Sequence, residues 1–94
     1  MLKVGVVGAT GYAGEEVIKI LANHKGVRIT ELQAVIDKEE PFSSIIPAFK
    51  GKVDLICKKP NPEEMAKGVD LVFLALPHKV SMEIAREKIL AQSK

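Results

Sequence analysis

Three glycines near the start of the chain have the spacing that a phosphate-binding turn requires. They are Gly8, Gly11 and Gly14, in the pattern G-x-x-G-x-x-G. Gly8 lets the backbone turn sharply, Gly11 leaves room for a phosphate to approach the main chain, and Gly14 allows a following helix to pack closely. N–H groups at the start of a helix, with the positive end of its dipole, attract anions. The spacing therefore predicts a pyrophosphate site, to which the hydroxyl of Thr10 can donate one more hydrogen bond.

The segments on either side of the glycines supply the elements that such a turn needs. The apolar, β-branched run from Leu2 to Val7 predicts a strand buried on both faces. Apolar residues at intervals of three or four predict a helix from Tyr12 to Asn23, with Gly26 as its left-handed C-terminal cap. Strand, glycine turn and helix in this order are typical of a dinucleotide-binding unit. A purely structural turn without a ligand is the alternative interpretation.

The rest of the chain predicts an open α/β sheet of the Rossmann-like type. Further strands are expected over Val27–Ile36, Lys52–Lys58 and Val69–Leu76, and an irregular loop or short helix between Glu39 and Gly51. Helices are expected from Pro62 to Gly68, with Asn61 as the cap, and from Ser81 to Ala91. With right-handed crossovers the four strands lie in the order 3-2-1-4, mostly parallel, flanked by helices and with the third at the edge. This order brings the glycine turn and the stretch from Leu76 to His78 to the same, carboxyl edge of the sheet.

Two charged residues follow the second predicted strand, where dinucleotide-binding folds contact the adenosine ribose. An acidic residue there, such as Asp37, accepts hydrogen bonds from the ribose hydroxyls and selects NAD. A basic residue, such as Lys38, accommodates the 2′-phosphate of NADP. Because the two residues are adjacent, the sequence leaves both cofactors open, and a charged turn without a ligand is the alternative.

The composition indicates one small soluble domain of 94 residues with a net charge of +2. No basic run is interleaved with aromatic residues, which disfavours a nucleic-acid partner, and no apolar stretch approaches the ~20 residues needed to cross a membrane. The N-terminus enters a strand at once, without a secretory signal, so a cytoplasmic location is expected. The one cysteine, Cys57, excludes an internal disulfide and is expected to be a packing residue. No catalytic residue and no metal site are predicted.

Two segments resemble a known enzyme family over essentially the whole chain. The segments VGATGYAGEEVIKIL and DLVFLALPHKVSMEIA are similar to the N-terminal part of the N-acetyl-gamma-glutamyl-phosphate reductases of arginine biosynthesis. The resemblance implies an NADPH-dependent reduction of an acyl phosphate to a semialdehyde, with release of phosphate, by a homo-oligomeric enzyme. It also places the family's catalytic cysteine and histidine in a later domain that this sequence does not contain.

The resemblance carries specific cofactor-binding residues onto this chain. The pyrophosphate turn matches Gly8, Thr10, Gly11, Tyr12, Ala13 and Gly14; the residue at the 2′-phosphate falls near Lys38; and the ribose and nicotinamide side matches Leu76, Pro77 and His78. Two residues depart from the family pattern. Lys79 stands where a glycine is usual, and Asp37 stands where a small hydroxyl residue is usual. A carboxylate at position 37 repels a 2′-phosphate, which leaves NADP against NAD open.

The leading interpretation is that residues 1–94 form an incomplete Rossmann-like domain that binds NADP(H) and is inactive alone because the catalytic domain is absent. A free-standing nucleotide-binding or sensing module without catalysis is one alternative. The same domain of an aspartate-semialdehyde dehydrogenase is another, which the stretch Leu76-Pro77-His78 disfavours.

Overall fold

Six strands form one sheet in the computed structural model, which describes residues 2–76 and 79–84 of the chain. The order is β3-β4-β2-β1-β5-β6, and the strands run over Leu2–Val7 (β1), Val27–Gln33 (β2), Glu40–Pro41 (β3), Ile56–Lys58 (β4), Leu71–Leu76 (β5) and Lys79–Ile84 (β6). The four inner strands are parallel, and β3 and β6 are antiparallel to their neighbours. The inner order β4-β2-β1-β5 confirms the predicted 3-2-1-4 arrangement and the Rossmann-like fold class.

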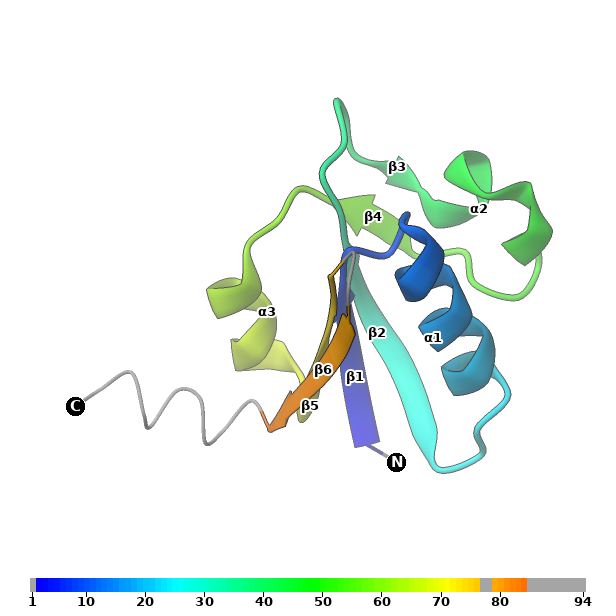
Figure 1. Cartoon of the computed structure of the whole chain (residues 1–94). Coiled ribbons are helices and arrows are strands. Elements are labelled where there is room, and N and C mark those ends of the chain that lie inside the picture. The colour runs from blue at the N-terminus through cyan, green and yellow to red at the C-terminus, as the bar shows by residue number, and fades with distance from the viewer. Residues whose placement is uncertain (1, 77–78, 85–94) are drawn as a thin grey trace.

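Helices cover both faces of this sheet, and the alternation of β1 explains how (Figure 1). The helices are α1 (Tyr12–Ala22), α2 (Phe42–Ile45), the 3-10 helix η1 (Pro47–Phe49) and α3 (Pro62–Gly68). Val4 and Val6 are fully buried in a core that also contains Ile18 of α1. Val7 packs on the other face against a smaller core around Met65 of α3. A strand with apolar residues on both faces therefore lies between two helical layers.

The predicted start of α3 is confirmed, whereas the predicted cap at the end of α1 is wrong. Helix α3 begins as expected, with Asn61 as its cap, because the Asn61 side chain accepts a hydrogen bond from the Glu64 N–H at 3.3 Å. The left-handed cap predicted at Gly26 is wrong, since in the described part of the chain only Gly8 and Gly51 have positive φ. Instead, the Asn23 side chain donates to the Lys19 carbonyl at 3.0 Å, which satisfies the last turn of α1 locally.

Three predicted strands are shorter in the structure. Strand β5 begins at Leu71 rather than at Val69. Strand β2 ends at Gln33: the N–H of Ala34 makes a last bond to the Lys58 carbonyl of β4, and Val35 then leaves the sheet with 91% of its surface exposed. Strand β4 covers only Ile56–Lys58, since the Val53 N–H is used in a turn with Phe49. The strand is also not at the edge as expected, because the short strand β3 pairs outside it.

The helix predicted from Ser81 to Ala91 is wrong over its first four residues, which belong to strand β6. This strand pairs antiparallel with β5, from Leu76 opposite Lys79 to Leu71 opposite Ile84. The sequence KVSMEI alternates polar and apolar residues, and this period of two fits a strand. The remainder of the predicted helix, residues 85–91, lies outside the described residues.

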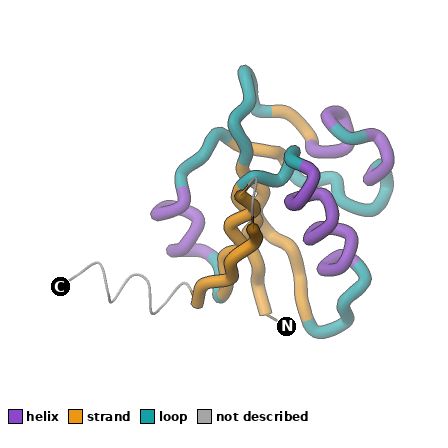
Figure 2. Tube along the Cα trace, in the orientation of Figure 1, coloured by secondary structure: helices purple, strands orange, loops and turns teal. Residues whose placement is uncertain are grey.

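The turn before α1 and the loop of residues 34–39 lie at the same end of the sheet (Figure 2). Both follow the carboxyl end of a parallel strand, β1 and β2 respectively. None of the helices in the described part of the chain is long and apolar enough to span a membrane. The fold thus gathers its loops of interest at one edge, where the candidate site is found.

Candidate functional site

The glycine turn is held between the ends of β2 and β5. Gly8 has a φ of +86°, as predicted for a sharp exit from the strand. The N–H groups of Gly8 and Ala9 both donate to the carbonyl of Gln33, at 2.8 and 3.0 Å. On the other side, a Cβ added to Gly8 would lie 2.5 Å from the carbonyl oxygen of Ala75. The turn is therefore fixed against both neighbouring strands.

Gly14 brings helix α1 close to this turn. A Cβ at position 14 would collide with the carbonyl oxygen of Gly8 and lie 2.9 Å from its carbonyl carbon. The neighbours are backbone atoms, which cannot move aside as a flexible side chain can. The packing role predicted for Gly14 is confirmed, because its lack of a side chain lets the start of α1 pack against the backbone of the turn.

The first turn of α1 presents its N–H groups without a side-chain cap. Gly11 is the N-cap residue, with φ −78° and ψ 165°, and its side-chain position is open: the nearest described atom to an added Cβ is the Gly8 carbonyl oxygen at 3.5 Å. Gly11 and Tyr12 are exposed, and Thr10 and Ala13 are half-buried beside them. The N–H groups of Tyr12 and Ala13 have no acceptor within the part of the chain that the structure describes. Such a helix start suits an anion.

A crevice of about 240 Å³ lies beside the glycine turn. It is lined by residues from the carboxyl ends of β1, β2 and β5 and from the loop before α3, namely Val7, Gly8, Ala34, Val35, Pro60, Leu74 and Ala75. Its lining is mainly apolar, and it sits where the strand order reverses around β1, which is where open α/β sheets bind ligands. Because small-molecule sites usually measure roughly 300–1,000 Å³, this crevice has room for part of such a ligand.

The structure brings together some of the predicted site residues and leaves others apart or undescribed. The turn of residues 8–14 meets the end of β5 at Ala75. Asp37 and Lys38 are exposed and belong to the loop of residues 34–39. That loop lies at the same end of the sheet as the glycine turn (Figure 1). Leu76 is the last residue of β5. Pro77 and His78 lie outside the described residues.

Sequence reasoning missed Gln33, the buried polar residue at the end of β2. Its side chain is 2% exposed and makes two hydrogen bonds with the backbone of Asn61: Nε2 donates to the carbonyl at 3.1 Å, and Oε1 accepts from the N–H at 2.8 Å. One glutamine among apolar strand residues gives no signal in the sequence. The only available hint was its position, directly before the loop that follows the second strand.

Cys57 is a packing residue, as expected. Its side chain is fully buried in the core between β4 and α2. Burial raises the pKa of the thiol above its ordinary value, and the negative charges of Glu39 and Glu40 raise it further. A thiol that stays protonated is a poor nucleophile, so Cys57 has no catalytic character.

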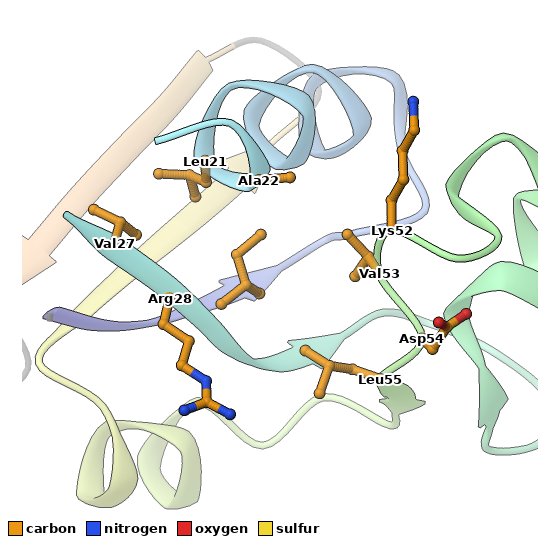
Figure 3. A pocket seen from close by; sticks show the side chains of 9 residues that line it. Leu21, Ala22, Val27, Arg28, Lys52, Val53, Asp54 and Leu55 are labelled. Carbon is orange, nitrogen blue, oxygen red and sulfur yellow. The ribbon is translucent and has the colours of Figure 1, made fainter. Parts of the chain in front are cut away.

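A second, larger cavity of about 460 Å³ lies at the opposite end of β2 (Figure 3). Leu21 of α1, Val27 of β2, and Val53 and Leu55 of the loop before β4 surround it, and the Arg28 side chain points away from them (Figure 3). No glycine turn and no helix N-terminus faces this cavity. The smaller crevice at the carboxyl edge is therefore the better candidate site, because Gly8 of the glycine turn lines it.

Comparisons with known proteins show the family of the chain and similar relatives. A family model described as "Semialdehyde dehydrogenase, NAD binding domain" matches residues 3–94. Similar relatives are named N-acetyl-gamma-glutamyl-phosphate reductase. The protein from Citrifermentans bemidjiense is 42% identical over 89% of this chain and 24% of its own length. That from Campylobacter hominis is 44% identical over 93% and 25%, and that from Nitrosococcus oceani is 36% identical over 99% and 27%. The chain thus spans about a quarter of the length of these curated relatives.

Proposed function

Because the chain belongs to the semialdehyde dehydrogenase NAD-binding domain family, we propose that it is the cofactor-binding part of an N-acetyl-gamma-glutamyl-phosphate reductase that uses NADPH. Such an enzyme reduces an acyl phosphate to a semialdehyde and releases phosphate. In this proposal the present residues bind and orient the cofactor, and the catalytic cysteine and histidine belong to a later part of the enzyme. The reductase names of the relatives favour this function over a free-standing nucleotide sensor or an aspartate-semialdehyde dehydrogenase.

The observation that carries the proposal is the uncapped start of α1 beside the crevice. The pyrophosphate would accept hydrogen bonds from the N–H groups of the first helical turn, in the space that a side chain at Gly11 would fill. The adenosine half would then lie toward the loop after β2, and the nicotinamide half toward the end of β5. Thr10 and Tyr12 flank the phosphates, and Leu76, Pro77 and His78 belong to the nicotinamide side.

Cofactor choice is proposed to depend on the loop after β2. The Lys38 ammonium favours the 2′-phosphate of NADP(H), whereas the neighbouring Asp37 carboxylate opposes it. We assign NADP(H) as the cofactor with reduced discrimination against NAD(H). NADP(H) is the usual cofactor of the reductases that the chain resembles, and this supports the assignment.

The partners and location of the full-length enzyme are proposed from the family resemblance and the composition. We infer a homo-oligomeric, cytoplasmic enzyme whose ligands are the cofactor and a small acyl phosphate. The net charge of +2 gives no electrostatic reason for binding nucleic acid.

A calorimetric titration of the chain with NADPH and NADH, repeated on Gly11→Val, tests the cofactor assignment. The extended backbone at Gly11, with φ −78° and ψ 165°, tolerates valine, so the fold should persist while the isopropyl group blocks the phosphates. We expect the affinity for NADPH to fall by more than about 100-fold, as for the loss of several charge-assisted hydrogen bonds.

Gly68→Val is the matched control. A Cβ at Gly68 meets nothing described within 4 Å, and this exposed position ends α3 away from the crevice. NADPH should bind this variant as it binds the wild type. Undiminished NADPH affinity in Gly11→Val would remove the assignment.

A further inference from the structure

Gln33 connects the two sides of the crevice through its backbone and its side chain. Its carbonyl accepts hydrogen bonds from the N–H groups of Gly8 and Ala9, and these bonds fix the glycine turn on one side. Its side-chain amide pairs with the N–H and carbonyl of Asn61, which fixes the loop on the other side. With 2% of its surface exposed, Gln33 is a buried polar residue whose side-chain groups are both satisfied by this one partner.

The pairing with Asn61 holds the loop that forms the outer wall of the crevice. Pro60, directly before Asn61, lines the crevice, and Pro62, directly after it, is the first residue of α3. Proline has no N–H, so Asn61 carries the one backbone donor in this stretch of three residues. That donor goes to Oε1 of Gln33 at 2.8 Å. The residues before Pro60 are held by the bonds from Ala34 to Lys58 and from Lys59 to Glu39, and on its other side the loop is held to β2 by the amide side chain of Gln33.

The structure assigns Gln33 as a positioning residue that sets the width of the cofactor crevice. This inference rests on the proposed function, and it concerns the adenosine half of the cofactor, since Val35 and Pro60 lie on the β2 side of the crevice. An apolar side chain at position 33 would leave the Asn61 N–H without its partner, whereas the Asn61 carbonyl would keep its hydrogen bond from the Met65 N–H. The loop would then move outward to reach water, because an unpaired buried polar group is costly. The start of α1 would be unaffected, since the backbone carbonyl at position 33 remains.

The test compares three probes on the purified chain: NADPH, adenosine 2′,5′-bisphosphate and inorganic pyrophosphate. Gln33→Met keeps the volume of the side chain and removes its hydrogen bonds. We expect its affinities for NADPH and adenosine 2′,5′-bisphosphate to fall by about tenfold, the effect of one lost buried hydrogen-bonding pair. Pyrophosphate affinity should stay within about twofold of wild type. This selective loss is a readout that a general loss of stability would not give.

Asn61→Ala is the matched control, because it removes the helix cap to Glu64 but leaves the backbone groups that pair with Gln33. It should bind all three probes as wild type does, in spite of a lowered melting temperature. Gln33→Asn, which keeps the amide on a shorter stem, provides a second variant should Gln33→Met not fold. It too should lose adenosine 2′,5′-bisphosphate affinity and keep pyrophosphate affinity.

Equal weakening of all three probes, or none, in both Gln33 variants would overturn the positioning role. So would a matching loss of adenosine 2′,5′-bisphosphate affinity in Asn61→Ala. Failure of the wild-type chain to bind NADPH is a different result, because it rejects the cofactor assignment itself and the role of Gln33 with it.

Discussion

Asp37 and Lys38 place opposite charges next to each other at the edge where the ribose is expected. Both side chains are exposed, so under the proposed function each would interact with a bound cofactor across a solvated gap. Unit charges about 4 Å apart interact by about 1 kcal/mol in water and by more near a protein surface. At the residue scale, cofactor preference is therefore a balance between two modest terms of opposite sign.

Removing the acidic member of this pair should shift that balance. We expect Asp37→Ser to raise the affinity for NADPH by about fivefold to tenfold, because the repulsion of the 2′-phosphate is lost. Affinity for NADH should fall, since the hydrogen bonds to the ribose hydroxyls weaken. Parallel titrations with the two cofactors measure the ratio. An unchanged ratio would show that residue 37 does not contact the ribose.

Cys57 gives the protein a pH-dependent stability at alkaline pH. Its folded-state pKa is raised, by burial first and by Glu39 and Glu40 next, above the ordinary value of 9.0 that it regains on unfolding. The native state therefore keeps the thiol proton where the unfolded state loses it. This contribution to stability is complete below pH 9.0 and is lost as the pH rises through the folded-state value.

Cys57→Ala should lack this alkaline loss. Urea unfolding of both proteins at pH 8 and pH 10 measures the effect, because all other titrating groups are common to the two. The variant is expected to be less stable than wild type at pH 8, by about 1 kcal/mol for the small cavity, and the gap should narrow at pH 10. A constant gap at both pH values would contradict the raised pKa.

At the scale of elements, local sequence patterns predicted the strands, turns and caps that depend on neighbouring residues. They missed the features that depend on contacts between residues far apart in the chain. Strand β1, the glycine turn and α1 followed from a β-branched run and from glycine spacing, and the cap at Asn61 followed from the Asn-Pro pair. Strand β3 has only two residues and exists because it pairs with β4. The role of Gln33 depends on Asn61, 28 residues later, and no local pattern encodes such a contact.

Residues 81–84 show how two periodicities compete in a short segment. Met82, Ala85 and Ile89 have helical spacing, whereas Val80, Met82 and Ile84 alternate as in a strand. The segment pairs with all six residues of β5, and the local sequence pattern gives no information about this pairing. The outcome turned on the partner strand rather than on the segment.

The exposure of Met82 distinguishes the strand from the helix that the spacing suggested. Met82 is 56% exposed in β6, so Met82→Lys should change the free energy of unfolding by less than about 0.5 kcal/mol. On the apolar face of a packed helix, the same change would cost about 2–5 kcal/mol. Met65→Lys is the matched control: Met65 is fully buried on α3, and a loss of about 3 kcal/mol or more is expected. A large fall in the free energy of unfolding of Met82→Lys, measured by chemical denaturation, would favour the predicted helix over strand β6.

At the scale of the whole molecule, the fold separates stability from binding. The two cores lie on the faces of the sheet, under α1 and α2 on one side and α3 on the other. The exposed groups suited to a ligand lie at the carboxyl edge, on the turn after β1 and the loop after β2. The loops that form an edge site of this kind can change in sequence with little effect on the packing of the cores.

A ligand held at this edge should nonetheless stabilise the entire chain, because it binds the folded state alone. At a concentration of 100 times its dissociation constant, NADPH should add about 2.7 kcal/mol to the free energy of unfolding. For a domain of this size, 1 kcal/mol shifts the melting temperature by roughly 4–8 °C, so an increase of roughly 10–20 °C is expected. Gly11→Val should melt close to wild type without NADPH and gain nothing from it, since its loss lies in the phosphate contacts. A shift of the same size in both proteins would mean that NADPH binds elsewhere, with the cavity beside Leu21 and Val53 as the next site to examine.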